Sequence, residues 1–327
     1  MTPCLETLLL IALPASGKSE VRRYLLHLPR ERRIEAFHVA DTVQLDDFPY
    51  VHFLRRTDEE LVRLGQARRF YHGPNARFQV LTDWGLLLHL VNDDYAVLAD
   101  PSRPSPPREA QALFERIDAA RRRTDGPVVF EGMDRGLRRD LSDALGDDAG
   151  RLVDELFGQR PATLAGRTVV IEFARGGPEG ATLPLSKPYG YRWNLSNLSP
   201  EILERAAVLY IWVTPEESRR KNLDRADPDD PGSSLHHSAP ESVMHNDYGS
   251  CDVAWLVEHA DHPDTIRIEA HGRVYHLPIA RFDNRVDKTS FLRGDPGSWD
   301  EVRVRALHEA LAGPMARLWA AYRAQGG

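Results

Sequence analysis

Cysteine and lysine are scarce in this chain of 327 residues, and each scarcity carries information. The two cysteines, Cys4 and Cys251, lie far apart in the sequence, which argues against a disulfide framework or a cysteine-based metal knuckle. Positive charge comes almost entirely from arginine, and the net charge is −7. Because nucleic-acid-binding proteins usually carry a basic face or arm, this balance argues against a nucleic-acid partner. The lysines are Lys18, Lys187, Lys221 and Lys288.

Long apolar runs are also lacking. The run at residues 8–13 is too short for a membrane span, or for the core of a signal peptide followed by a cleavage site. We therefore expect a cytoplasmic protein with no membrane partner. Apolar residues nevertheless make up 42% of the chain, enough to fill the core of one large domain or two modest ones.

Five apolar segments predict buried strands that alternate with helical stretches. Three of them, "VVFEG", "VVIEF" and "VLYIWVT", are continuous runs, which are typical of strands covered on both faces in a parallel sheet. This order predicts a doubly wound α/β fold, in which ligands bind at the carboxyl ends of the strands. The five segments are Thr7–Leu13, Ala36–Leu45, Pro127–Glu131, Thr168–Phe173 and Ala207–Thr214.

A single domain is expected to span residues 1–327, with a mostly parallel sheet flanked by helices. Residues 50–125 are interpreted as an insertion that binds substrate, and residues 215–265 as a lid, because they include a long loose stretch. No internal repeat is visible. Near the C-terminus, Gly313-Pro314 predicts a break in an otherwise helical segment.

Residues 12–19 follow the first predicted strand and match the phosphate-binding pattern G-x-x-x-x-G-K-[ST], with Ala12 in place of the first glycine. In such a loop, successive N–H groups and a helix N-terminus hold phosphates. Gly17 allows the tight turn, Lys18 reaches the terminal phosphates and Ser19 ligates Mg²⁺. A methyl group at Ala12 is acceptable if the local φ is negative. A chance triplet is the alternative, which the scarcity of lysine disfavours. The candidate nucleotide-binding residues are Ala12, Leu13, Pro14, Ala15, Ser16, Gly17, Lys18 and Ser19.

The segment "ALPASGKSEVRRYL", followed by "VQLDDFPY" and "VVFEG", resembles the P-loop kinase group. The likeness is to uridine kinase and phosphoribulokinase-like enzymes and to nucleoside monophosphate kinases. It implies a P-loop NTPase fold and the use of ATP and Mg²⁺. It also implies that Asp46 contacts the acceptor hydroxyl as a base, and that Glu131 lies near the metal and its waters.

Each of these acids also has a simpler interpretation. Asp46 can be a helix cap or a turn residue, and Glu131 can be the partner in a buried ion pair. Glu172, in "VVIEFARGG", is a third acid at the end of a predicted strand. The sequence does not distinguish a site role for Glu172 from a structural ion pair.

A second informative stretch, residues 210–228, contains a capping box at Thr214 and Glu217 with proline at the first helical position. It resembles the lid entry of P-loop kinases, where arginines clamp the transferring phosphate. Helical geometry lets at most two of its four basic residues face one ligand, and Arg219 and Arg225 are the candidates. A solvated basic face is the alternative. The histidines downstream lack zinc-ligand spacing.

Together these features predict an ATP- and Mg²⁺-dependent phosphotransferase that acts on a small hydroxylated acceptor, such as a nucleoside, a nucleotide or a sugar-like compound. Aromatic and amide side chains at residues 186–200 predict either part of an acceptor pocket or a packed connection. Three alternatives remain: a regulatory NTPase that transfers phosphate to water, a binding module for an anion, and a kinase of nucleic-acid ends or bases. The lack of an Asn-Lys-x-Asp segment disfavours a GTPase.

Overall fold

The computed structural model describes residues 4–224 and 238–326, so Arg225 and much of the expected lid loop lie outside the described residues. The chain divides into two compact units. The first comprises Met1–Gln44, Ala165–Ser196 and Pro200–Gly327, and the second comprises Leu45–Leu164 with Asn197–Ser199. The second unit therefore begins before, and ends well after, the insertion expected from the sequence.

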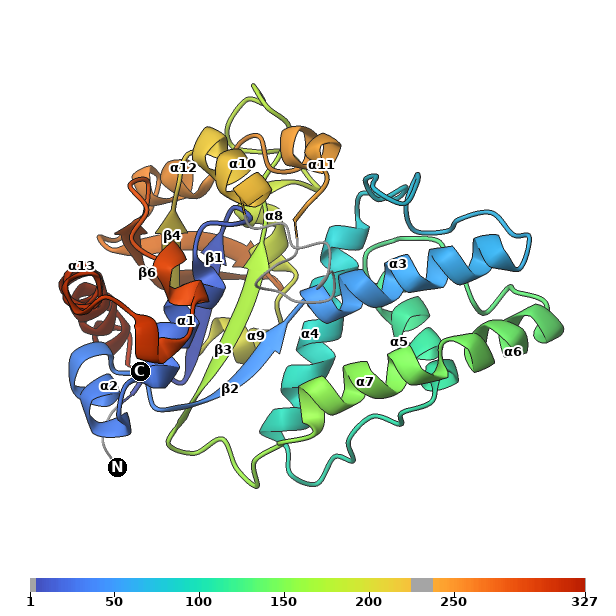
Figure 1. Ribbon diagram of the computed structural model, residues 1–327, viewed down its shortest axis with the longest axis horizontal. Coiled ribbons are helices and arrows are strands. Elements are labelled where there is room, and N and C mark those ends of the chain that lie inside the picture. The colour runs from blue at the N-terminus through green and yellow to red at the C-terminus, as the bar shows by residue number, and fades with distance from the viewer. Residues whose placement is uncertain (1–3, 225–237, 327) are drawn as a thin grey trace. The chain divides into compact units, whose positions relative to one another are not determined.

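A six-stranded sheet has the order β2-β3-β1-β4-β6-β5 (Figure 1). Strand β1 runs parallel to β3 and to β4, β4 runs parallel to β6, and β5 is antiparallel to β6 at the sheet edge. The α/β class with a mostly parallel sheet, predicted from the sequence, is confirmed. The strands are β1 Thr7–Ala12, β2 Asp41–Asp46, β3 Arg167–Ala174, β4 Ala206–Trp212, β5 Thr265–Ala270 and β6 Arg273–Asp283.

The three central strands, β3, β1 and β4, were predicted because their apolar residues are contiguous and buried on both faces. The segment Ala36–Leu45 is a strand only from residue 41, because helix α2 occupies its beginning. The hairpin of β5 and β6 was missed. Its turn places His271 and Gly272 at positive φ, and Pro278 lies within the second strand, where proline argues against a strand.

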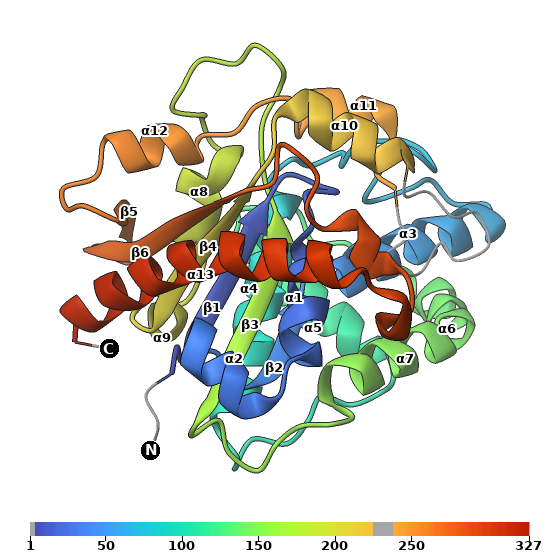
Figure 2. The same ribbon diagram turned by 60° about the vertical axis from the view of Figure 1, so that its left-hand side comes forward.

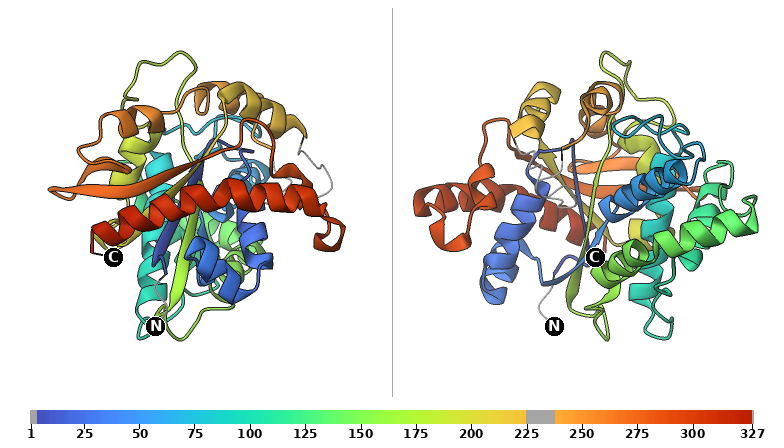
Figure 3. Two further views of the ribbon diagram at one scale, coloured as in Figure 1. Left: turned by 90° about the vertical axis from the view of Figure 1, so that its left-hand side faces the viewer. Right: turned by 45° about the vertical axis from the view of Figure 1, so that its right-hand side comes forward.

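Helices of the first unit pack against this sheet. Helix α13 runs across β6 and β4 on the face that also carries α1 and α2 (Figure 2), and α12 lies beside the β5–β6 hairpin (Figure 3). The helices are α1 Lys18–His27, α2 Arg30–Phe37, α8 Gly190–Ser196, α9 Pro200–Leu203, α10 Pro215–Asp224, α11 Glu241–Asn246, α12 Val253–Glu258 and α13 Glu301–Ala324, with 3₁₀ turns at Ser290–Arg293 and Pro296–Ser298.

The break predicted at Gly313-Pro314 is wrong, because α13 continues through both residues. Its buried side chains Leu311, Met315 and Leu318 pack into the core formed with β1, β4 and β6. In proteins, packing of an amphipathic face contributes more to helix stability than local propensity does. Here that packing outweighs the hydrogen bond lost at the proline.

The second unit is helical. Two of its loops share one arrangement: Asp58 accepts hydrogen bonds from the N–H groups of residues 69–71, and Asp118 accepts them from residues 129–131. The middle residues of the two loops, Phe70 and Phe130, have ring centroids 6.0 Å apart. This repeated arrangement is not visible in the sequence. The helices are α3 Phe48–Arg63, α4 Asp83–Ala99, α5 Ala110–Arg122, α6 Arg135–Ala144 and α7 Gly146–Phe157.

The strand predicted at Pro127–Glu131 is therefore wrong. The N–H groups that a strand would offer to a sheet are instead bound by the carboxylate of Asp118. Among the residues that the structure describes, no helix combines the length and the apolar character needed to cross a bilayer.

Candidate functional site

The phosphate loop, residues 12–19, connects β1 directly to α1, which begins at Lys18. Ala15 has φ of 54°, and Gly17 has φ of 102° and ψ of 17°. Left-handed residues in a short loop make a concavity of backbone N–H groups, and the first turn of α1 adds its positive end. A loop with these dihedral angles, followed by a helix N-terminus, can bind an anion.

Gly17 is required for two reasons. Its positive φ disfavours a side chain, and a Cβ atom there would lie 2.4 Å from Oγ1 of Thr289 and 2.9 Å from Nδ2 of Asn284. Ala12, in contrast, is part of strand β1 and pairs with Ala174 of β3. Because the backbone at Ala12 is extended, the missing first glycine does not distort the loop.

Side chains from three other elements hold the phosphate loop. The Tyr191 hydroxyl donates to the carbonyl of Ala12 (2.8 Å) and accepts from the Ala12 N–H (2.9 Å). Ser218 Oγ donates to the carbonyl of Pro14 (2.7 Å), and Asn284 Nδ2 donates to the carbonyl of Ser16 (2.8 Å). Burial raises the pKa of Tyr191, so its hydroxyl stays protonated. These bonds tie the loop to α8, to α10 and to the segment that follows β6.

Glu172 is the carboxylate that the first unit places beside the loop. Its Oε2 lies 3.3 Å from Oγ of Ser19, and the residue is 2% exposed. Its Oε1 forms an ion pair with Nη1 of Arg22 at 3.2 Å. Within the described ranges, that oxygen accepts no hydrogen bond.

The Ser19–Glu172 pair fits a hydrated Mg²⁺ ion. Magnesium prefers oxygen ligands, usually keeps several waters, and needs only one or two protein carboxylates when phosphates supply the rest. Oε2 of Glu172, which contacts the Ser19 hydroxyl, is the oxygen placed to contribute, because Oε1 is already paired with Arg22. Among residues 4–224 and 238–326, no cluster of three or more His, Cys, Asp or Glu side chains offers an all-protein metal site.

Of the two acids that the resemblance assigned to the site, Asp46 lies at a strand end as predicted and Glu131 does not. Glu131 belongs to the second unit, lies on a loop rather than at a strand end, and is mostly exposed in an ion pair with Arg122. Asp46 ends β2, and its Oδ1 accepts from the N–H of Phe48 at 2.9 Å, as expected for a turn residue. The role of Asp46 toward an acceptor stays a prediction.

Helix α10 begins as predicted, with the Glu217 N–H donating to Oγ1 of Thr214 at 3.2 Å. Arg220 lies on the solvent side and pairs with Glu217 and Asp224, which matches the alternative of a solvated basic face. Arg219 is more buried. Its Nη2 is 3.6 Å from Glu179, while its Nη1 is buried with no hydrogen bond to any described residue. Arg219 therefore remains a candidate for binding an anion.

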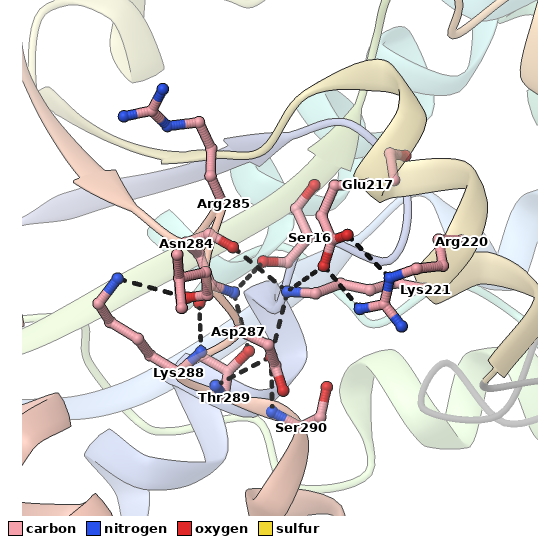
Figure 4. A network of polar contacts seen from close by, with 12 residues as sticks. Ser16, Glu217, Arg220, Lys221, Asn284, Arg285, Asp287, Lys288, Thr289 and Ser290 are labelled. Atoms are coloured by element: carbon pink, nitrogen blue, oxygen red, sulfur yellow. Dashed lines mark hydrogen bonds and ion pairs between the residues drawn. The ribbon is translucent and has the colours of Figure 1, made fainter.

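A polar network follows β6, and no pattern in the sequence predicted it (Figure 4). The segment Asn284–Ser290 joins the phosphate loop through Asn284 and joins α10 through Lys221, which is 2% exposed. The sequence feature that could have indicated this network is the tetrapeptide Asn284-Arg285-Val286-Asp287. It differs from the Asn-Lys-x-Asp pattern only by arginine at its second position.

The segment predicted as part of an acceptor pocket borders a cavity of about 450 Å³ in the first unit. Helix α8 contributes to this cavity and also carries Tyr191, whose hydroxyl binds the end of β1. The residues lining it include Leu185, Ser186, Lys187, Arg192, Trp193 and Glu269.

No protein-family model matches this chain, and no curated protein or solved structure matches it. The phosphate loop and the residues that contact it therefore define the candidate site.

Proposed function

We propose that this protein is an ATP- and Mg²⁺-dependent phosphotransferase whose phosphate loop holds the nucleotide phosphates. The observation that supports this most directly is the Ser19–Glu172 pair beside a loop that enters α1 through a left-handed Gly17. The left-handed loop that leads into the N-terminus of α1 and the Ser19–Glu172 oxygen pair lie together at the carboxyl end of a parallel sheet, which supports the proposal. The carboxyl end is where α/β folds bind ligands.

Each residue of the site has a separate role. The loop N–H groups and the Lys18 ammonium bind phosphate oxygens. Ser19 and Glu172 would hold Mg²⁺, which would supply neutralisation of the charge on the phosphate oxygens. Arg219 offers a further cation for the charge that develops during transfer. Glu172 thus replaces Glu131 as the proposed metal-associated acid.

The reaction breaks the bond between the γ-phosphorus and its bridging oxygen and forms a bond to the acceptor oxygen, which loses its proton. Such transfer depends on positioning and charge neutralisation more than on covalent chemistry by the protein. Asp46 is the acid that the resemblance assigns to the acceptor proton. The acceptor we propose is a small hydroxylated molecule.

The test is ADP release from Mg²⁺–ATP by wild type and Lys18→Ala, with and without a panel of nucleosides, nucleotides and sugars. The proposal expects one acceptor class to accelerate ADP release in wild type and not in the variant. ADP release that no acceptor changes would contradict the phosphotransferase.

A nucleotide-hydrolysing regulatory NTPase is the second candidate. The observation that favours it is the segment Asn284-Arg285-Val286-Asp287, which follows β6 and contacts the phosphate loop. Its test is phosphate release from GTP compared with ATP in the absence of any acceptor. A clear preference for GTP would favour this candidate over the first.

A further inference from the structure

Lys221 is a buried lysine on the inner side of α10. Its Nζ lies 3.1 Å from Oδ1 of Asp287, donates to the carbonyl of Asn284 at 3.3 Å, and lies 3.8 Å from Oε1 of Glu217 (Figure 4). Burying an ammonium group is costly unless it is paired. Lys221 is buried and paired at this position, whereas the neighbouring Arg220 faces solvent.

The turn that Lys221 contacts is closed at both ends. Asp287 Oδ1 accepts from the N–H groups of Thr289 (3.2 Å) and Ser290 (3.1 Å), and Asn284 Oδ1 accepts from the N–H of Lys288 (2.8 Å). Burial alone would raise the pKa of Asp287, but the Lys221 charge and these hydrogen bonds lower it to about 2. Lys221 therefore binds the turn at two points, the Asn284 carbonyl and the Asp287 carboxylate.

The same turn contacts the phosphate loop. Nδ2 of Asn284 donates to the carbonyl of Ser16 at 2.8 Å and to Oγ1 of Thr289 at 2.9 Å. The side chains of Asn284 and Thr289 lie within 3 Å of the position that a Cβ atom of Gly17 would occupy. A displacement of the turn would move the two residues of the loop that immediately precede Lys18.

We propose that Lys221 is a positioning residue for the phosphate loop and acts through Asn284. Lys221 fixes the turn, the turn orients the Asn284 amide, and the amide fixes the carbonyl of Ser16, so that the adjoining N–H groups keep the orientation that binds phosphate. The inference rests on the proposed nucleotide binding by this loop.

The experiment compares Lys221→Met with Arg220→Met, a matched loss of a cation from the adjacent position of the same helix. The dissociation constant of Mg²⁺–ATP is measured for each at a temperature well below its melting temperature, which is recorded separately without ligand. We expect Lys221→Met to weaken binding about tenfold and Arg220→Met to leave it within twofold of wild type. Equal affinities for wild type and Lys221→Met would overturn the inference, even if the variant melts at a lower temperature.

Asn284→Ala and the double variant Lys221→Met/Asn284→Ala test the route. Because Lys221 acts through Asn284, the double variant should bind within about twofold of Asn284→Ala alone. If the loss of affinity in the double variant equalled the product of the losses in the two single variants, Lys221 would act independently of Asn284. That result would overturn this part of the inference. A global effect on folding is controlled by Asn92→Ala, which removes comparable bonds between an amide and the backbone in the second unit.

If Lys221→Met does not fold, the pair Thr289→Val and Thr289→Ser replaces it. The valine removes the hydroxyl that accepts from Asn284, and the serine keeps it. Weaker binding for valine with wild-type binding for serine supports the positioning network, and equal binding overturns it. Wild type that binds no Mg²⁺–ATP refutes the proposed function itself, whereas wild-type binding that none of these variants weakens refutes only this inference.

Discussion

The hydroxyl of Ser19 and the carboxylate of Glu172 lie 3.3 Å apart, although 153 positions separate them in the sequence. Ser19 is in the first turn of α1, and Glu172 lies on β3, opposite Leu10 of β1. The pairing of β1 with β3 therefore creates the candidate metal site. Neither residue could form it alone.

Replacing Glu172 should weaken Mg²⁺ binding. Glu172→Gln keeps the shape of the side chain but removes the charge and one strong oxygen donor. The affinity for Mg²⁺ in the presence of ATP should therefore fall by at least the roughly 10-fold that loss of an outer partner of a metal ligand costs. The measurement is a Mg²⁺ titration at fixed ATP. Glu131→Gln is the control and should titrate like wild type. If only the Glu131 variant lost affinity, the acid chosen from the resemblance would be the correct one.

Gly17→Ala should be costlier than a glycine replacement that introduces only backbone strain. Gly65 also has a positive φ, but a Cβ there meets nothing within 4 Å, so Gly65→Ala should cost about 1–2 kcal/mol. Gly17→Ala adds a clash with Thr289 and Asn284 and should exceed that cost. Thermal unfolding without ligand measures both. Equal melting temperatures for the two variants would show that the close approach at Gly17 is not a constraint.

Asp287 should make stability depend on acid pH. Its folded pKa of about 2 lies below the value of about 3.9 in an unfolded chain, so its ionised form stabilises the fold above about pH 4. This contribution, about 2 kcal/mol, is lost as the pH falls from about 4 toward 2. The gap in unfolding free energy between wild type and Asp287→Asn, measured in urea, should therefore be widest at pH 6 and narrower at pH 3. A gap independent of pH would contradict the pairing with Lys221.

The parts of the fold that the sequence predicted are those decided by local residues. The strand, loop and helix of residues 7–27 were predicted because the apolar run, Gly17 and the following helical pattern are contiguous. The start of α10 was predicted from its capping residues in the same way.

The features that were missed depend on contacts between distant segments. The "VVFEG" segment reads as a strand, but Asp118 binds its N–H groups from another element. The sequence did not distinguish a site role for Glu172 from an ion pair, because the order of the strands in the sheet decides which acid lies beside Ser19. The network around Lys221 and Asn284 joins α10, the turn after β6 and the phosphate loop, and no local pattern predicts that meeting.

Binding of nucleotide by residues 12–19 is the central claim, and thermal unfolding of wild type and Lys18→Ala with Mg²⁺–ATP and Mg²⁺–GTP tests it most directly. At a ligand concentration one hundred times the dissociation constant, binding stabilises the folded state by about 2.7 kcal/mol, which raises the melting temperature by several degrees. We predict such a rise for wild type with at least one nucleotide, and its loss in Lys18→Ala. No rise in wild type with either nucleotide would contradict the account.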